Sequence, residues 1–183
     1  MRIEPRLDEI VNGERGMLRG IDVCLERQCL VSAVALLFGA IDALSALTRP
    51  TANPDTDHDV FEAWVERYLL PGSALDCGAE DLYAARCGVL HTYGADSRLA
   101  RQGRARPLVY QWRHGPAADA AAPLPPDAIV VEVEALHNAF RKAVAMFLDA
   151  SEMEDPVRES VQHHLPSLLC YTPWPRLSVH VAA

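Results

Sequence analysis

Arg86 and His91 lie five positions apart in this sequence. An arginine and a histidine are residue types that suit acid–base chemistry at a phosphate. A histidine exchanges protons near neutral pH, and an arginine holds a phosphate with its planar fork and stabilises charge that grows in a transition state. On an α-helix, residues five apart are rotated by about 140° and separated by about 7.5 Å along the axis. The two therefore do not share a tight face, but arginine is long enough for both heads to reach one cleft.

The stretch that carries this pair, residues 79–93, has the pattern of a helix. Tyr83, Cys87 and His91 recur at a spacing of four and share one face of it. The first 16 residues are predicted as a loose lead-in or a short helix. Apolar residues at spacings of three and four predict further helices over residues 17–48, 57–70, 134–151 and 156–164.

The helix predicted over residues 17–48 is the longest, about 45 Å at about 1.5 Å per residue. Between Cys29 and Leu47 its one charged residue is Asp42. A membrane-spanning helix needs about 20 apolar residues, and this segment is rich in Ala, Ser and Gly. We therefore expect the central helix of a bundle, buried on more than one side by other helices of the chain or by a partner subunit.

Two strands are predicted after the motif helix, at residues 107–112 and 128–133. The residues between them, 114–127, are rich in proline and alanine and are predicted as a loop. Together they predict a β-hairpin inserted between the motif helix and the C-terminal helices, at about residues 104–134. The predicted fold is mainly all-α, a helical bundle with this insertion, in a single domain over residues 1–183.

The residues Arg-Cys-Gly-Val-Leu-His at 86–91, preceded by Asp-Leu-Tyr in a helical bundle, resemble the RxxxxH motif of HEPN domains. The small-residue stretch 38–45 strengthens the resemblance, because HEPN proteins often have a first helix with an acidic residue that faces the motif helix. The resemblance covers roughly residues 17–93 and 134–165.

This resemblance implies a metal-independent endoribonuclease in which two motif helices meet across a homodimer and form a composite cleft. On this interpretation His91 is the acid/base at the ribose 2′-hydroxyl or the leaving oxygen, and Arg86 is the phosphate clamp. Asp42 would pair with Arg86 and hold it in place, with Tyr83 and Cys87 as supporting residues. RNA is the expected substrate, in a toxin–antitoxin or defence role with an antitoxin protein as a further partner, and no cofactor is expected.

Other interpretations of the same residues remain open. Many HEPN domains have no nuclease activity and serve as dimerisation or ligand-binding modules, and Cys87 stands where active members usually carry a polar residue. As structural residues, Arg86 would neutralise Asp42 or Asp81, and His91 would be a satisfied core histidine near a helix end. Cys87 and His91 are spaced like half of a metal site, but no second pair matches, so no metal site is predicted.

The formal net charge of −8 repels nucleic acid in bulk, so a contact with RNA requires a local basic patch. Such a patch follows the motif. It predicts either a track for RNA phosphates beside the cleft or a solvated loop, and Gly103 argues against a stable helix there. Its members are Arg98, Arg101, Arg104, Arg106 and Arg113.

The cysteines are odd in number and scattered, with no CxxC spacing, so the sequence predicts reduced thiols. The N-terminal residues contain acids and no apolar signal region. We therefore expect a cytoplasmic protein without a membrane span. The cysteines are Cys24, Cys29, Cys77, Cys87 and Cys170.

Overall fold

The computed structural model describes residues 4–53, 55–94, 97–113, 123–125 and 127–169, which are mainly helical with one small sheet. The elements are α1 (Pro5–Asn12), α2 (Met17–Glu26), α3 (Leu30–Ala46), α4 (His58–Trp64), the π-helical turn η1 (Val65–Leu69), α5 (Ala79–Thr92), α6 (Arg98–Arg101), β1 (Leu108–Gln111), β2 (Ile129–Glu132), α7 (Val133–Met153), α8 (Asp155–His164) and the 3₁₀ turn η2 (Leu165–Ser167).

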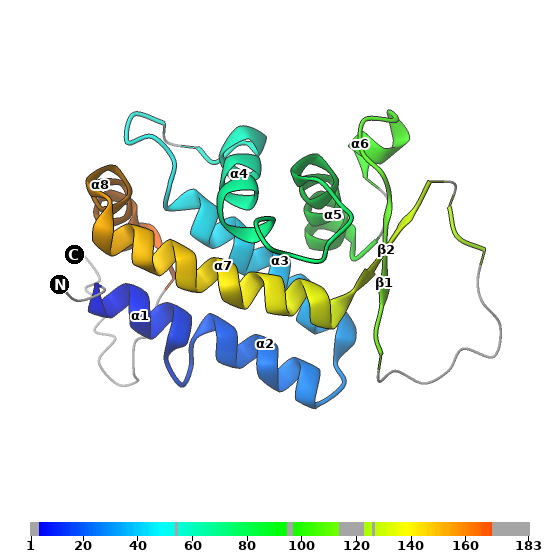
Figure 1. The fold of residues 1–183 in the computed structure, drawn as a ribbon, viewed down its shortest axis with the longest axis horizontal. Coiled ribbons are helices and arrows are strands. Elements are labelled where there is room, and N and C mark those ends of the chain that lie inside the picture. Colours follow the sequence, from blue (N-terminus) through cyan, green and yellow to red (C-terminus); the bar gives the residue numbers. More distant parts are fainter. Residues whose placement is uncertain (1–3, 54, 95–96, 114–122, 126, 170–183) are drawn as a thin grey trace, which may run out of the picture.

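The helices are arranged around α3 and α7. In Figure 1, α7 runs along the molecule with α1 and α2 on one side and α4 and α5 on the other, while α3 passes behind it. α3 packs against α2, α4, α5 and α7. Buried apolar side chains from both strands and from every described α-helix except α6 form one continuous core.

The prediction of a central buried helix is confirmed for α3. Phe38, Ile41 and Leu44 are fully buried, and the buried residues of α3 lie on one broad face of the helix. Val31 and Leu36 are exposed, so burial on more than one side of the helix is not observed within the described residues of a single chain. Among the described residues, no helix has the length and apolar character needed to cross a membrane.

The prediction of one continuous helix over residues 17–48 is wrong. α2 ends at Glu26, α3 begins at Leu30, and the two helices pack against each other as a helical hairpin (Figure 1). The helical spacing of apolar residues is correct within each half, but the chain reverses between them.

A Schellman motif causes the reversal. Gln28 adopts a left-handed conformation with φ of 61°. The Cys29 amide donates to the Cys24 carbonyl at 2.8 Å, and the Gln28 amide donates to the Leu25 carbonyl at 3.0 Å. These two bonds satisfy the last carbonyls of α2 and end the helix. Glycine is the usual residue in this position, so a glutamine gave no signal in the sequence.

The prediction of a β-hairpin at about residues 104–134 is wrong in its topology. The strands lie where they were expected, but they pair in parallel, with Leu108 opposite Ile129 and Gln111 opposite Glu132. β2 then leads directly into α7.

The length of the connection allows this parallel pairing. A tight turn can join only antiparallel strands, whereas parallel strands need a crossover of about a dozen residues or more. The chain from residue 112 to residue 128 has that length. The loop predicted at 114–127 lies mostly outside the described residues.

The other predicted helices are confirmed, with local differences. Asp57 begins α4 by accepting a hydrogen bond from the Val60 amide at 3.1 Å, and a π-helical turn follows the helix. Pro156 lies at the second position of α8, one residue later than the first position where proline is most favourable. Part of the N-terminal lead-in forms α1, and the irregular tail predicted after Pro166 lies outside the described residues from residue 170 onward.

Candidate functional site

α5 carries the candidate motif, and its ends are well defined. Gly78 lies at the N-cap, and its amide donates to the carboxylate of Asp81 in the first turn at 3.0 Å. Tyr93 ends the helix in a left-handed conformation with φ of 53°. His91 therefore lies in the last turn of the helix, and Arg86 lies in its middle.

Arg86 and Asp42 form a bidentate ion pair that joins α5 to α3. Arg86 Nε donates to Asp42 Oδ1 at 2.9 Å, and Arg86 Nη2 donates to Asp42 Oδ2 at 2.7 Å. The two side chains are 21% and 27% exposed. Burial alone would lower the pKa of Arg86, but the hydrogen bond and the charge of Asp42 outweigh burial and raise it. The pairing expected from the sequence is confirmed.

His91 is exposed, and within the described part of the chain it has no hydrogen bond or ion pair. Arg86 is turned toward α3, whereas His91 lies about a turn and a half further along α5, rotated by about 140°. A single chain therefore does not bring the two heads together. The prediction that they act in one cleft is untested.

Tyr83 and Cys87 lie on the side of α5 between the directions of Arg86 and His91, and they line a cavity of about 350 Å³. The Tyr83 ring contacts His58 and Phe61, with centroids 5.9 Å and 5.5 Å away. Burial raises the pKa of the Tyr83 hydroxyl, and the neighbouring Cys87 thiol adds to the effect. Cys87 Sγ also lies 4.0 Å from Arg86 Nη1, so it stands between the ion pair and the cavity.

The basic segment divides into two parts. Arg98 and Arg104 line the same cavity, and Arg104 is paired with Glu80 at 3.1 Å. Arg98 and Arg101 are the ends of the single-turn helix α6, which stops where Gly103 takes a φ of 68°. The segment therefore forms only a short helical turn, which ends before Gly103.

Arg106 is engaged elsewhere. Its amide and its Nη2 donate to the two oxygens of Asp81, each at 2.7 Å. Burial would raise the pKa of Asp81, but hydrogen bonds from Arg106 and Gly78 outweigh burial and lower it. Arg106 thus fixes the start of the insertion against α5, and a role for it in RNA binding is untested.

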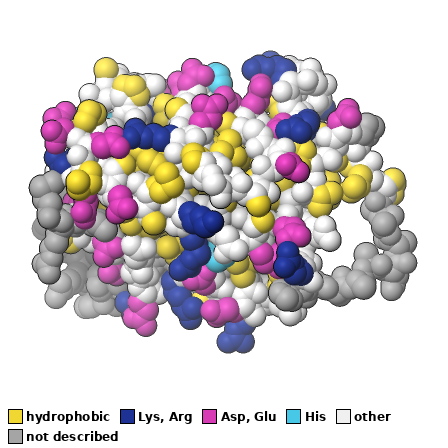
Figure 2. Space-filling model, in the orientation of Figure 1, with side chains coloured by type: hydrophobic (Ala, Val, Ile, Leu, Met, Phe, Trp, Pro, Cys, Tyr) yellow, Lys and Arg dark blue, Asp and Glu magenta, His cyan; other side chains and the backbone are white. Residues whose placement is uncertain are grey.

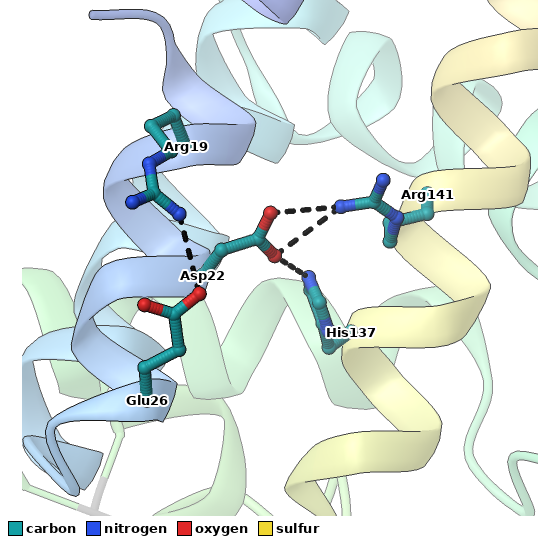
Figure 3. Close-up of polar contacts among 5 residues, drawn as sticks. All are labelled: Arg19, Asp22, Glu26, His137 and Arg141. Carbon is teal, nitrogen blue, oxygen red and sulfur yellow. Dashed lines mark hydrogen bonds and ion pairs between the residues drawn. The ribbon is translucent and has the colours of Figure 1, made fainter. Parts of the chain in front are cut away.

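One group of ionisable residues was not singled out from the sequence. Asp22 on α2 faces His137 and Arg141 on α7 (Figure 3). Arg141 Nη1 lies 3.2 Å and 3.1 Å from the Asp22 oxygens, and His137 Nε2 lies 3.0 Å from Asp22 Oδ1 without the alignment of a hydrogen bond. Burial lowers the pKa of His137, although Asp22 opposes the shift. The four-residue spacing of His137 and Arg141 on one helix face was the available signal.

The described residues contain no group of three or more histidine, cysteine or acidic side chains arranged to hold a metal ion. Cys24, Cys29, Cys77 and Cys87 are free thiols, and burial raises the pKa of Cys77 to about 11. Cys170 lies outside the described residues.

Comparison of the chain with protein-family models, with curated proteins and with solved structures found no match. The resemblance to HEPN domains therefore depends on the motif residues and on the helices that carry them.

Proposed function

We propose that this protein is a HEPN-like, metal-independent endoribonuclease that acts as a homodimer, in a toxin–antitoxin or defence role. The observation that carries the proposal is the bidentate Asp42–Arg86 pair on the helix that also presents an exposed His91. The resemblance implies such a pairing between an acidic residue and the motif helix, although Asp42 lies on α3 and not on the first helix of the chain.

The unused edge of Arg86 supports a phosphate-binding role. Asp42 engages Nε and Nη2, and among the described residues Nη1 has only the weak contact with Cys87. The pair fixes the plane of the guanidinium, so Nη1 is oriented before an RNA phosphate arrives. In the proposed reaction His91 takes the proton of a ribose 2′-hydroxyl, and the resulting oxygen attacks the adjacent phosphorus as the bond to the 5′-oxygen breaks. The protonated His91 then gives its proton to the 5′-oxygen, and a 2′,3′-cyclic phosphate remains.

A second copy of the chain is part of this proposal. Within one chain Arg86 and His91 point in different directions, so a composite cleft needs a histidine or an arginine from a partner. α3 offers a surface for a partner, because Val31 is 62% exposed, Leu36 is 45% exposed, and Gly39 faces open space. On the face shown in Figure 2, acidic and basic side chains are interspersed, which does not suit a long RNA track there.

A non-catalytic binding module is the second candidate. It is favoured by the same ion pair, because Asp42 already holds two of the three guanidinium nitrogens. It is also favoured by the adjacent cavity, which Tyr83 and Cys87 line and which Arg86 and His91 do not. In this case Arg86 and His91 would serve packing and recognition rather than cleavage.

The test is cleavage of a labelled RNA pool in EDTA by protein shown to be dimeric by light scattering. His163→Ala is the matched control, since His163 is also an exposed histidine in the last turn of a helix. We expect the wild type and His163→Ala to cleave, and His91→Ala to lose cleavage. No cleavage by a folded dimer would favour the binding module, and equal cleavage by all three proteins would remove His91 from the mechanism.

A further inference from the structure

The cavity beside the motif helix has walls of opposite chemical character. α5 forms its floor, α4 lies on one side and α6 on the other, as the order of these helices in Figure 1 shows. Its volume of about 350 Å³ lies at the lower end of the range typical of small-molecule sites.

The α6 wall is basic. Arg98 projects from it, and within the described residues Arg98 has no hydrogen bond or ion pair. Arg104 lies on the same wall, although Glu80 neutralises part of its charge. A guanidinium without an acidic partner at the rim of a cavity is suited to bind a phosphate group.

The α4 wall is acidic. Glu62 lines it, and Asp59, Glu66 and Glu80 add negative potential around it. Burial is the main reason that the pKa of Glu62 is raised. A carboxylate here is suited to accept two parallel N–H bonds from a ligand.

The floor between the walls is aromatic. The half-buried Tyr83 ring lies there, tilted by 50° to the ring of His58. Aromatic side chains of this kind stack on nucleobases, whose faces are flat and apolar. Gln102 adds an amide that can donate and accept at the edge of a base.

We infer that this cavity binds a single nucleotide, with its base stacked on Tyr83 and its phosphate on Arg98. The polarity of the cavity selects the base. Guanine presents an N1–H and an amino group side by side, which match the two oxygens of Glu62, whereas adenine presents only its amino group. The nucleotide is therefore a guanine nucleotide, either free or as part of an RNA chain. Binding of a guanine nucleotide that is part of an RNA chain rests on the proposed RNase function, in which the cavity would hold a base near the cleaved bond.

The binding test uses the full-length protein and isothermal titration with GMP, AMP, guanosine and inorganic phosphate. We expect GMP to bind most tightly, with AMP and guanosine each weaker by about tenfold or more because each lacks one set of contacts. Binding of inorganic phosphate as tight as that of GMP would overturn the inference, because it would show an anion site without base recognition. Absence of GMP binding at millimolar concentration would also overturn it.

Substitutions of the cavity residues test which side chain makes each contact with the nucleotide. We expect Arg98→Ala to weaken GMP binding by about tenfold and to leave guanosine binding unchanged. Glu62→Gln should reduce the preference for GMP over AMP, and Tyr83→Leu should weaken every nucleotide, whereas Tyr83→Phe keeps the ring and should bind normally if folding is intact. Arg19→Ala is the matched arginine control, since Arg19 pairs with Glu26 on α2 and lies outside the cavity. GMP binding that is unaffected by Arg98→Ala and by Tyr83→Leu would overturn the assignment.

The source of the nucleotide and the proposed nuclease are tested separately. A trinucleotide ending in guanosine that binds at least tenfold more tightly than GMP would indicate an RNA chain, and equal or weaker binding would indicate a free nucleotide. RNA cleavage without GMP binding would overturn the cavity assignment and keep the nuclease. GMP binding without RNA cleavage would keep the cavity and remove the nuclease.

Discussion

Within the described residues, two groups made of an aspartate, an arginine and a histidine are arranged in opposite ways. On α5, Arg86 pairs with Asp42 while His91 is exposed without a partner in the described structure. Between α2 and α7, Asp22 gathers both a histidine and an arginine in one half-buried cluster (Figure 3).

The difference separates residues that hold helices together from residues that are available for chemistry. In the α2–α7 cluster the histidine is only 14% exposed and faces its aspartate, so a substrate has little access to it. On α5 the ion pair joins two helices, and His91 is exposed. On the proposed function the accessible histidine is therefore the catalytic candidate, and the cluster in which charged groups converge is structural.

The largest expected effect is a contrast between two histidine variants, since substitution of His91 should change RNA cleavage and substitution of His137 should change stability. We expect His91→Ala to lower RNA cleavage by about 10²-fold or more and to leave the melting temperature unchanged. We expect His137→Ala to leave cleavage by the folded protein unchanged and to cost about 1–2 kcal/mol of unfolding free energy, because it removes a partly buried ring. Single-turnover cleavage and thermal melts measure both. The reverse pattern would place the active histidine in the α2–α7 cluster.

The next effect compares the two aspartates. Asp42→Asn leaves the charge of the mostly buried Arg86 without a counter-charge, and we expect a loss of about 2 kcal/mol. Asp22→Asn should cost less, about 0.5–1 kcal/mol, because Arg141 is 47% exposed and water can solvate it. Urea unfolding of both variants measures the difference. Equal losses would show that the Asp42–Arg86 pair is no more buried in solution than the α2–α7 cluster.

A smaller effect depends on pH. The folded state lowers the pKa of His137 below its unfolded value, so the unfolded chain binds a proton more readily. Stability contributed by neutral His137 is therefore complete above about pH 6.5 and is lost as the pH falls from there toward the folded pKa. His164, whose pKa burial also lowers, acts in the same direction. We expect His137→Gln to lose less stability between pH 7 and pH 5 than the wild type, in urea titrations at both pH values. An equal loss would mean that His164 or other groups carry the whole dependence.

The smallest effect is expected at the edge of the α2–α7 cluster. Arg19 and Glu26 are 51% and 59% exposed, and exposed pairs contribute little. We expect Arg19→Ala to change the unfolding free energy by less than about 0.5 kcal/mol, with Arg27→Ala as a control on the same surface. A loss above about 1 kcal/mol would show that Arg19 stabilises the cluster around Asp22.

Much of the fold follows from local patterns that the sequence displays. The loss of charge around Asp42 predicted the central helix, and the resemblance to HEPN domains implied the pairing of Asp42 with Arg86. The helices and strands themselves followed from apolar periodicity and from proline and glycine positions. In the candidate site, the spacing of Arg86 and His91 already predicted their separation on the helix, but the exposure of His91 needed the three-dimensional structure.

The features that were predicted wrongly or missed have a common cause. Contacts between residues far apart in the sequence are not determined by local sequence patterns. Gln28 ends α2 in a conformation that glycine usually takes, so the helical hairpin was predicted as one helix. The direction of β2 relative to β1 depends on a long connection, and no residue near either strand encodes it. Asp22 and Arg141 are 119 positions apart, and only packing of α2 on α7 brings them together.

The turn at Gln28 has a consequence for the order of folding. α2 and α3 are neighbours in the chain and pack on each other, so their contacts close a loop of only a few residues and cost little chain entropy. The contact of Asp22 with α7 closes a loop of more than a hundred residues. We therefore expect the α2–α3 hairpin to be structured early in the folding transition state, and the clamp between α2 and α7 to form late, when most of the chain is already in place.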